Sequence, residues 1–277
     1  AVIRFGVEGK AAVDYFRKQT GVAITVCDAY QKEIPLGYKE VAFKFGPNYL
    51  SDLKNFDLII RSPGIPYLKK EFNEVRDLLT SVTKYFFEKC PCPIVGVTGT
   101  KGKGTTVSLL YEMLKEWNQE QTTVYLGGNI GRPPLEFLDA LKPNDLVLLE
   151  LSSFQLQDLD KSPHISLVLG ITPDHMDHHA SWEEYVGAKK NSVRFQQKND
   201  FAILDGDNPV SKNFASFTKA KTYEVTLGNT VKQGGFLRVG SLILKAGKTG
   251  ILIGEKGATG LIGDHNIKNI LAASVVA

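Results

Sequence analysis

The chain has 277 residues, of which 43% are hydrophobic and 23% are charged. This balance is typical of a globular protein with about two domains, and it excludes the disordered class. No apolar run approaches the roughly 18 residues that a membrane-spanning helix requires, and the N-terminus shows no signal-peptide pattern. The net charge of +3 is too small to indicate nucleic-acid binding. We therefore expect a cytoplasmic protein without nucleic-acid or membrane partners.

The first 90 residues alternate between apolar runs and helical patterns. The apolar runs that predict strands are residues 2–7, 22–27 and 57–65, and the helical stretches are residues 11–18 and 80–89. Such alternation predicts a Rossmann-like parallel sheet. Ligands of these sheets bind beyond the carboxyl ends of the strands, where Gly6, Gly9 and Asp28 lie. These three residues also form an incomplete dinucleotide fingerprint.

Residues 90–93, Cys-Pro-Cys-Pro, are typical of a boundary between domains spanning 1–90 and 91–277. The chain has three cysteines, too few for a disulfide framework, and the close pair lacks the partners of a zinc site. A second α/β pattern follows. Its predicted strands are residues 94–99, 145–152, 165–172 and 200–206, its main helix is 105–117, and short hairpins over 222–253 suggest a small sheet at the edge.

Residues 263–277 begin like a helix, with Asp264 as a candidate cap, and Ile267, Ile270, Leu271 and Val275 lie on one face. The pattern reaches Ala277 without a helix-stop signal, so we expect a truncated chain.

The sharpest local motif is GVTGTKGKGTT, residues 96–106, between a predicted strand and an amphipathic helix. Glycines let backbone N–H groups point at a phosphate, the helix N-terminus adds partial positive charge, and Lys103 can reach the outer phosphates. The motif departs from the strict phosphate-loop pattern, because Gly104 stands where a Mg²⁺-binding hydroxyl follows the lysine. A nucleotide-binding loop is nevertheless favoured over a plain glycine-rich loop.

Residues 98–106, TGTKGKGTT, resemble the nucleotide loop of the Mur ligase superfamily, which includes folylpolyglutamate synthases. Further blocks agree in order: SPGI (62–65), GGNIG (127–131), ELSSFQL (150–156), TPDHMDHH (172–179) and GDHNIKN (263–269). The GGNIG and ELSSFQL blocks are most similar to the D-glutamate-adding members. The resemblance implies a central phosphate-loop-type α/β domain after the first domain. The family's third, amino-acid-binding domain would begin after residue 277.

The resemblance implies an ATP-dependent amide ligase that joins D-glutamate to UDP-N-acetylmuramoyl-L-alanine through an acyl phosphate, in peptidoglycan synthesis. The implied catalytic residues are Lys103, Glu150, His175 and Lys189. Glu150 and a loop hydroxyl, Thr105 or Thr106, would hold one Mg²⁺, and His175 and Lys189 a second. An ammonium cannot bind Mg²⁺, so Lys189 is expected to be carbamylated as in relatives. Without the third domain the chain is expected to bind substrate but not turn it over.

The resemblance also implies two sets of binding residues. Those for ATP are Gly99, Thr100, Lys101, Gly102, Lys103, Gly104, Thr105, Thr106, Asn266 and Asn269. Those for the UDP substrate are Val7, Glu8, Gly9, Asp28, Ala29, Tyr30, Ser62, Gly64, Asn129, Gln155 and His175. Glu8 beside a diphosphate and Tyr30 in place of a basic residue depart from the family pattern.

Other interpretations stay open from the residues alone. His175, His178 and His179 fit a surface cluster, Lys189 fits a solvated helix lysine, and Asn266 and Asn269 fit helix capping. At the level of function, the alternatives are a folylpolyglutamate synthase-like ligase, a non-catalytic nucleotide-sugar-binding module and, last, a nicotinamide dehydrogenase. The long first domain disfavours the folate ligase, and the incomplete fingerprint disfavours the dehydrogenase.

Overall fold

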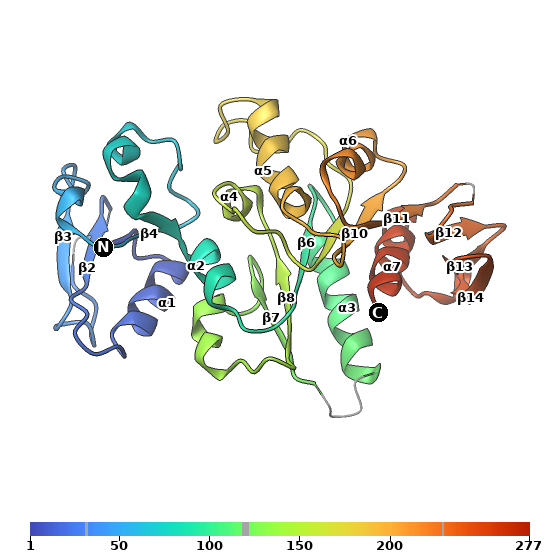
Figure 1. The fold of residues 1–277 in the computed structure, drawn as a ribbon, viewed down its shortest axis with the longest axis horizontal. Coiled ribbons are helices and arrows are strands. Elements are labelled where there is room, and N and C mark those ends of the chain that lie inside the picture. Colours follow the sequence, from blue (N-terminus) through green and yellow to red (C-terminus); the bar gives the residue numbers. More distant parts are fainter. Residues whose placement is uncertain (31–32, 118–121, 229) are drawn as a thin grey trace.

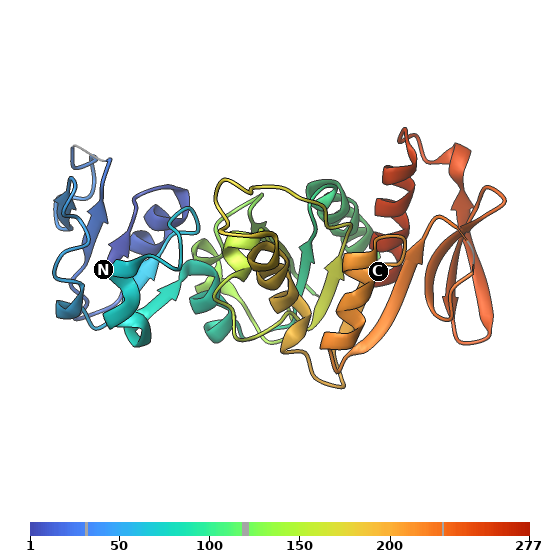
Figure 2. The ribbon, with the colours of Figure 1, turned by 90° about the horizontal axis from the view of Figure 1, so that it is seen from above.

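The computed structural model describes residues 1–30, 33–117, 122–228 and 230–277, and for Trp117 the backbone only. The chain forms two sheets arranged along the long axis of the molecule (Figure 1). Seen from above, the first sheet lies at one end and strands β12 to β14 lie at the other (Figure 2). Within the described residues, no helix is long and apolar enough to cross a membrane.

The first sheet has five strands in the order β3-β2-β1-β4-β5, and all of its strand pairs are parallel. Its strands are β1 (Val2–Ile3), β2 (Thr25–Asp28), β3 (Ala42–Phe45), β4 (Ile59–Arg61) and β5 (Leu79–Ser81). The crossover from β1 to β2 contains helix α1 (Val7–Phe16), which buries Ala12, Val13 and Phe16. The predicted Rossmann-like parallel sheet is confirmed.

The second sheet has nine strands in the order β14-β13-β12-β11-β10-β9-β6-β8-β7. Its strands are β6 (Ile94–Thr98), β7 (Val124–Gly128), β8 (Leu146–Glu150), β9 (Ile165–Val168), β10 (Phe201–Asp205), β11 (Lys221–Thr226), β12 (Gly234–Arg238), β13 (Ser241–Ala246) and β14 (Thr249–Glu255). From β12 across the sheet to β7, including β6, neighbouring strands are parallel. Strands β12, β13 and β14 pair antiparallel. The predicted central α/β domain is confirmed.

The remaining helices cover the second sheet and the junction between the sheets. They are α2 (Val82–Lys89), α3 (Lys103–Trp117), α4 (Ser153–Leu156), α5 (Trp182–Arg194), α6 (Pro209–Asn213) and α7 (Asp264–Val276). The 3₁₀ segments between strands of the first sheet are Leu53–Asn55 and Lys70–Leu78, and those of the second part are Pro134–Glu136, Leu138–Ala140, Phe214–Phe217 and Lys256–Ala258. Helices α3 and α7 lie side by side against the sheet (Figure 1). They bury Leu110, Leu114, Ile267 and Leu271 in one apolar cluster.

A shared apolar core joins the two sheets. It combines Val13, Phe16 and Phe86 with Phe137 and Leu149 of the second part of the chain. Aromatic rings meet edge to face within it: the Phe86 and Phe137 ring centroids are 5.7 Å apart. Burial of these apolar side chains stabilises the relative placement of the two sheets.

Several predicted boundaries are wrong. The first predicted strand ends at Ile3 rather than residue 7, and α1 begins at Val7. Residues 80 and 81 belong to β5 rather than a helix, because the Ser81 hydroxyl accepts the Lys84 N–H and so caps α2 at Val82. Asp264 is the first residue of α7, after Gly263, rather than its cap.

The hairpins predicted at the sheet edge are confirmed for β12, β13 and β14, which pair antiparallel, but not for β11. Strands β11 and β12 run parallel, with Glu224 opposite Gly234 and Thr226 opposite Phe236. Gly234, at φ +128°, begins β12 where a Cβ would overlap the Glu224 carbonyl oxygen. The strands over 221–255 form the edge of the central sheet.

Candidate active site

The loop between β6 and α3 takes a form that requires glycine. Gly99 and Gly102 have φ values of +148° and +83°. A Cβ on Gly99 would lie 2.7 Å from the Leu169 Cβ, and one on Gly102 would lie 2.6 Å from the Asn269 Oδ1. The loop therefore lies in close contact with Leu169, just after β9, and with Asn269 of α7. It continues directly into the N-terminus of α3. Backbone N–H groups at such a helix start suit a phosphate group.

Two lysines frame this loop. Lys103 opens α3, and its Nζ donates to the Thr100 carbonyl at 3.0 Å. Lys189 lies on α5, is 2% exposed, and donates from Nζ to the Gly99 carbonyl at 2.8 Å. Burial, and secondarily the charge of Lys103, lower the pKa of Lys189 to about 7. Lys189 is therefore a buried group beside the loop and not a solvated helix lysine.

The next residue along α5 lies differently. Lys190 places its Nζ 3.7 Å from the centre of the Phe217 ring, away from the loop. The two adjacent lysines of the sequence thus occupy different environments, and only Lys189 contacts the glycine loop.

Thr100 connects the loop to two neighbouring segments by hydrogen bonds. Its hydroxyl donates to the Thr172 carbonyl and accepts the Thr172 N–H, both at 2.9 Å, and the Tyr185 hydroxyl lies at 2.9 Å. Its hydrogen-bonding capacity is used in holding the 172–180 segment and α5 to the loop. Of the two candidate metal-binding hydroxyls, Thr105 is exposed, whereas the Thr106 Oγ1 is buried and has no hydrogen-bond partner among the described residues.

Glu150 ends β8 beside the start of α3. It is 4% exposed, and its Oε1 accepts from the Asn129 Nδ2 at 2.8 Å. A Cβ on Gly104 would lie 3.3 Å from the Glu150 Oε2, so the carboxylate faces the helix start. Gly128, at φ +101°, has no room for a Cβ, which would overlap the Glu150 carbonyl oxygen. The GGNIG and ELSSFQL blocks therefore meet at Glu150.

This arrangement fits a magnesium ion. Mg²⁺ is usually bound by one or two carboxylates together with substrate phosphates and waters, rather than by an all-protein cage. Glu150 supplies a carboxylate oxygen at the open side of Gly104, next to the phosphate-binding loop. Within the described residues, no group of three or more His, Cys, Asp and Glu side chains could hold a metal ion.

The three clustered histidines occupy different environments. His175 and His178 are exposed and lie beside Asp174 and Asp177, respectively. His175 has a φ of +53°, in the left-handed region. His179 is 4% exposed, so the surface-cluster interpretation is wrong for it.

His179 and its neighbours attach the 172–180 segment to α4. The His179 Nε2 lies 2.9 Å from the Ser153 Oγ, and its ring stacks on Phe154 with centroids 4.9 Å apart. Burial lowers the pKa of His179. Sequence reasoning did not single out this residue, because HxxHH gives no sign of which ring is buried.

The carboxyl edge of the first sheet gathers most of the residues predicted to bind the UDP group. The Asp28 carboxylate accepts from the Phe5 and Tyr30 N–H groups, each at 2.8 Å. The Ser62 hydroxyl donates to the Arg4 carbonyl at 3.0 Å. Val7 and Tyr30 are 75% and 82% exposed. Ala29 and Gly64 follow β2 and β4, and Gly9, in the first turn of α1, has no space for a Cβ against the Arg4 carbonyl.

A polar contact joins this edge to the second sheet. The Gln155 Nε2 donates to the Glu8 Oε1 at 2.8 Å, while its Oε1 accepts from the Ser152 N–H in a capping box. Gln155 is 1% exposed and has both ends of its amide occupied. Burial raises the pKa of Glu8 to about 7, and the Glu8 Oε2 has no partner among the described residues. Beside this pair, Arg61 and Asp158 form an ion pair at 3.3 Å.

A pocket of about 610 Å³ lies between the glycine loop and the start of α7. It is lined by Thr100, Lys101, Gly102, Leu169, Gly170, Thr172, Asp205, Leu227, His265, Lys268 and Asn269. The Asn269 Nδ2 donates to the Asn266 Oδ1 at 3.4 Å, and Asn266 also donates to the Ile262 carbonyl at 2.9 Å. Asn269 therefore faces the loop, whereas Asn266 is used at the start of α7.

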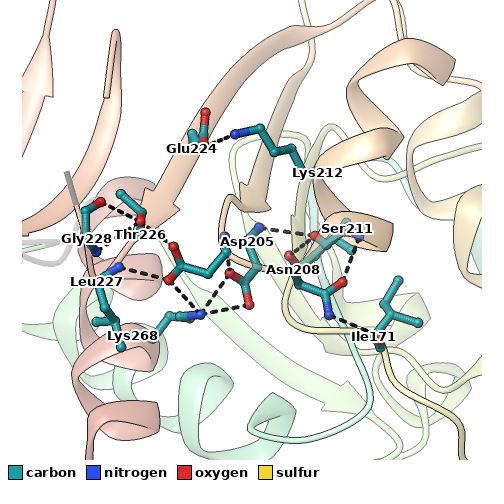
Figure 3. A network of polar contacts seen from close by, with 12 residues as sticks. Ile171, Asp205, Asn208, Ser211, Lys212, Glu224, Thr226, Leu227, Gly228 and Lys268 are labelled. Carbon is teal, nitrogen blue, oxygen red and sulfur yellow. Dashed lines mark hydrogen bonds and ion pairs between the residues drawn. The ribbon is translucent and has the colours of Figure 1, made fainter. Parts of the chain in front are cut away.

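A polar network forms one wall of that pocket (Figure 3). The Lys268 Nζ lies 2.9 Å from both the Asp205 Oδ1 and the Asp207 Oδ2. Asp207 accepts in turn from the Thr226 hydroxyl and the Leu227 N–H. Lys268 thereby fastens α7 to β10 and β11, and its pKa is raised by these carboxylates despite its burial.

Comparisons with known proteins identify the family of this chain. The family model of the Mur ligase middle domain matches residues 97–277. The curated UDP-N-acetylmuramoylalanine--D-glutamate ligase of Acetivibrio thermocellus is 39% identical over 238 residues, which is 85% of this chain and 50% of that protein. The protein of the same name from Clostridium kluyveri is 32% identical over 98% of this chain and 60% of its own length. The chain thus spans about half to three fifths of these relatives.

Solved structures share the fold. The murein peptide ligase of Psychrobacter arcticus has a TM-score of 0.56 at 14% identity and covers 98% of this chain and 63% of its own. The pseudomurein peptide ligase type C of Methanothermus fervidus has a TM-score of 0.52 at 20% identity and covers 99% and 66%. At these identities the likeness concerns the fold alone. With the middle-domain model matching most of the sequence, the chain belongs to the Mur ligase family.

Proposed function

We propose that this chain is the UDP-substrate-binding and ATP-binding part of a ligase that joins D-glutamate to UDP-N-acetylmuramoyl-L-alanine in peptidoglycan synthesis. One observation carries the proposal: Lys103, Lys189 and Glu150 converge on a single glycine loop. Activating a carboxylate with ATP brings anionic groups together, and preorganised charge is the main means of stabilising that arrangement. The relatives named above support D-glutamate as the added amino acid.

In this proposal the glycine loop and the start of α3 bind the ATP phosphates through backbone N–H groups, and Lys103 turns from the Thr100 carbonyl to the outer phosphates. The pocket beside Gly102 takes the adenosine, with Asn269 facing it and Asn266 holding Asn269 in place. Lys101 lines the same pocket and adds positive charge.

Glu150 would hold a Mg²⁺ ion, with Thr105 as the proposed hydroxyl ligand in place of the side chain that Gly104 lacks. When bound, Mg²⁺ neutralises the crowded phosphate charge. A second ion near His175 and Lys189 requires Lys189 to carry an acidic group. Only the neutral amine reacts with CO₂. Lys189 can adopt this neutral form near neutral pH, because burial lowers its pKa to about 7.

The first domain, residues 1–90, would bind the UDP group at the carboxyl edge of its sheet, with the backbone around Val7 to Gly9 facing the diphosphate. Asn129 and Gln155 would lie where the muramoyl peptide passes. In the structure Asn129 holds Glu150 and Gln155 holds Glu8, so both would position charged groups as well as contact substrate. Because ATP and nucleotide-linked sugars are cytoplasmic metabolites, we place this reaction in the cytoplasm.

Calorimetric titration of the chain with four ligands tests the proposal. UDP-N-acetylmuramoyl-L-alanine and Mg·ATP should each bind, whereas a folate and NAD should not. Binding of the folate in preference to the UDP compound would favour the folylpolyglutamate synthase-like alternative. Binding of the UDP compound without any ATP binding would favour a non-catalytic module.

A further inference from the structure

Arg4 occupies a backbone position suited to glycine. Its φ is +72°, in the left-handed region that strains residues with a Cβ. The segment Arg4-Phe5-Gly6-Val7-Glu8-Gly9 has the spacing of a G-x-G-x-x-G turn with arginine in the first glycine position. Glycine would adopt this conformation without strain, so stability of the turn does not account for the arginine.

The Arg4 side chain faces a pocket between the two sheets. It is exposed, and its Nη1 lies 3.4 Å from the Gly64 carbonyl oxygen. A Cβ on Gly64 would lie 2.5 Å from that nitrogen, so the glycine leaves space for the guanidinium. The pocket, about 570 Å³, is shared with Phe154 and His178 of the second sheet's loops.

The charges around this pocket leave Arg4 without a counter-charge. Lys69 pairs with Glu71 at 3.6 Å, and His178 pairs with Asp177 at 3.1 Å. Glu184, the acidic lining residue, accepts from the Gln157 side chain and the Ala180 N–H. Across the described ranges, no carboxylate lies within ion-pair distance of Arg4. The pocket therefore presents one unpaired guanidinium, next to the first turn of α1.

We propose that Arg4 binds the phosphate groups of the UDP-linked substrate, a contact added by this chain to the backbone N–H groups of the turn. The inference rests on the proposed function of the first domain. A guanidinium offers a planar fork of donors that matches phosphate oxygens, and such charge-assisted hydrogen bonds are among the stronger ones. Glu8 does not oppose this contact, because its carboxyl group is turned to Gln155.

Titrations with UDP and with uridine test the inference, because the two probes differ only in the diphosphate. Arg4→Gly should weaken UDP binding about ten- to hundredfold, the range expected for a hydrogen bond to a charged group. It should leave uridine binding within about twofold, and its melting temperature should equal or exceed that of the parent, since backbone strain is relieved. Arg4→Asn, which tolerates the left-handed region, is a second variant that also removes the charge.

Val239→Gly is the matched control. Val239 also has a positive φ, +50°, and is 98% exposed in the turn between β12 and β13. It should relieve strain in the same way and leave UDP binding unchanged. If both Arg4 variants bind UDP as tightly as the parent, or lose uridine and UDP equally, the inference is wrong. If the parent binds neither probe, the proposed role of the first domain fails, which is a separate result.

Discussion

Glu8 gives the most quantitative prediction. Its pKa rises from 4.5 to about 7 because the carboxyl group is buried between α1 and α4. Below about pH 4.5 the group is protonated in both the folded and the unfolded chain. Between pH 4.5 and 7 the unfolded chain releases its proton while the folded chain keeps it, so stability falls as pH rises, and above pH 7 the loss is complete.

The difference between the two pKa values corresponds to at most about 3 kcal/mol of folding free energy at pH 8. Glu8→Gln removes the titration but keeps an acceptor for the Gln155 Nε2. We therefore expect the variant to match the parent near pH 5 and to be more stable than the parent at pH 8. Urea unfolding followed from pH 5 to 8.5 measures this difference.

Glu74→Gln is the control with the opposite sign. Glu74 is exposed, and its pKa is lowered by the hydrogen bond and charge of Lys54. Its substitution should give no gain in stability at high pH. The reasoning is refuted if the free energies of unfolding of Glu8→Gln and the parent stay parallel across the whole range.

Three further predictions concern the glycine loop and its neighbours. Lys103→Ala should weaken ATP binding at least about thirtyfold, since a buried charge-assisted contact is worth roughly 2–5 kcal/mol, whereas Lys115→Ala at the far end of α3 should not change it. Equal calorimetric affinities of Lys103→Ala and the parent would contradict the loop assignment. With ¹³C-labelled bicarbonate, the parent and Lys190→Ala should show a carbamate signal by NMR and Lys189→Ala should not; a signal that persists without Lys189 would refute the modification. Gly128→Ala should destabilise the fold by more than about 1 kcal/mol, because the new Cβ overlaps the Glu150 carbonyl oxygen; a urea midpoint equal to that of the parent would show that the GGNIG turn tolerates a side chain.

The local parts of the fold and site could be predicted from the sequence. Runs such as residues 94–99 and 165–172 are apolar enough to indicate buried parallel strands, and both contain strands, β6 and β9. The glycine loop could be recognised because its motif stands between a predicted strand and an amphipathic helix. The structure adds that its glycines approach Leu169 and Asn269 closely. Strand β3, which is half-buried and short, carries no such signal.

Long-range contacts could not be predicted. Gln155 and Glu8 are 147 positions apart, and their pairing depends on how the two sheets meet. The burial of His179 depends on Phe154 and Ser153 of another segment. The left-handed conformation of Arg4 belongs to the tight turn between β1 and α1. The sequence shows the spacing of this turn only if arginine is allowed at the first glycine position of the motif.

The central claim is that the ATP site and the UDP-substrate site meet at Lys189 and Glu150. A crystal structure with UDP-N-acetylmuramoyl-L-alanine, Mg²⁺ and a non-hydrolysable ATP analogue measures this directly. The account predicts triphosphate on residues 99–104, the UDP group at the carboxyl edge of the first sheet, and the alanine carboxylate within roughly 3–4 Å of the terminal phosphate. A sugar-peptide that leaves the first domain in another direction, with its carboxylate remote from Lys189 and Glu150, would contradict it.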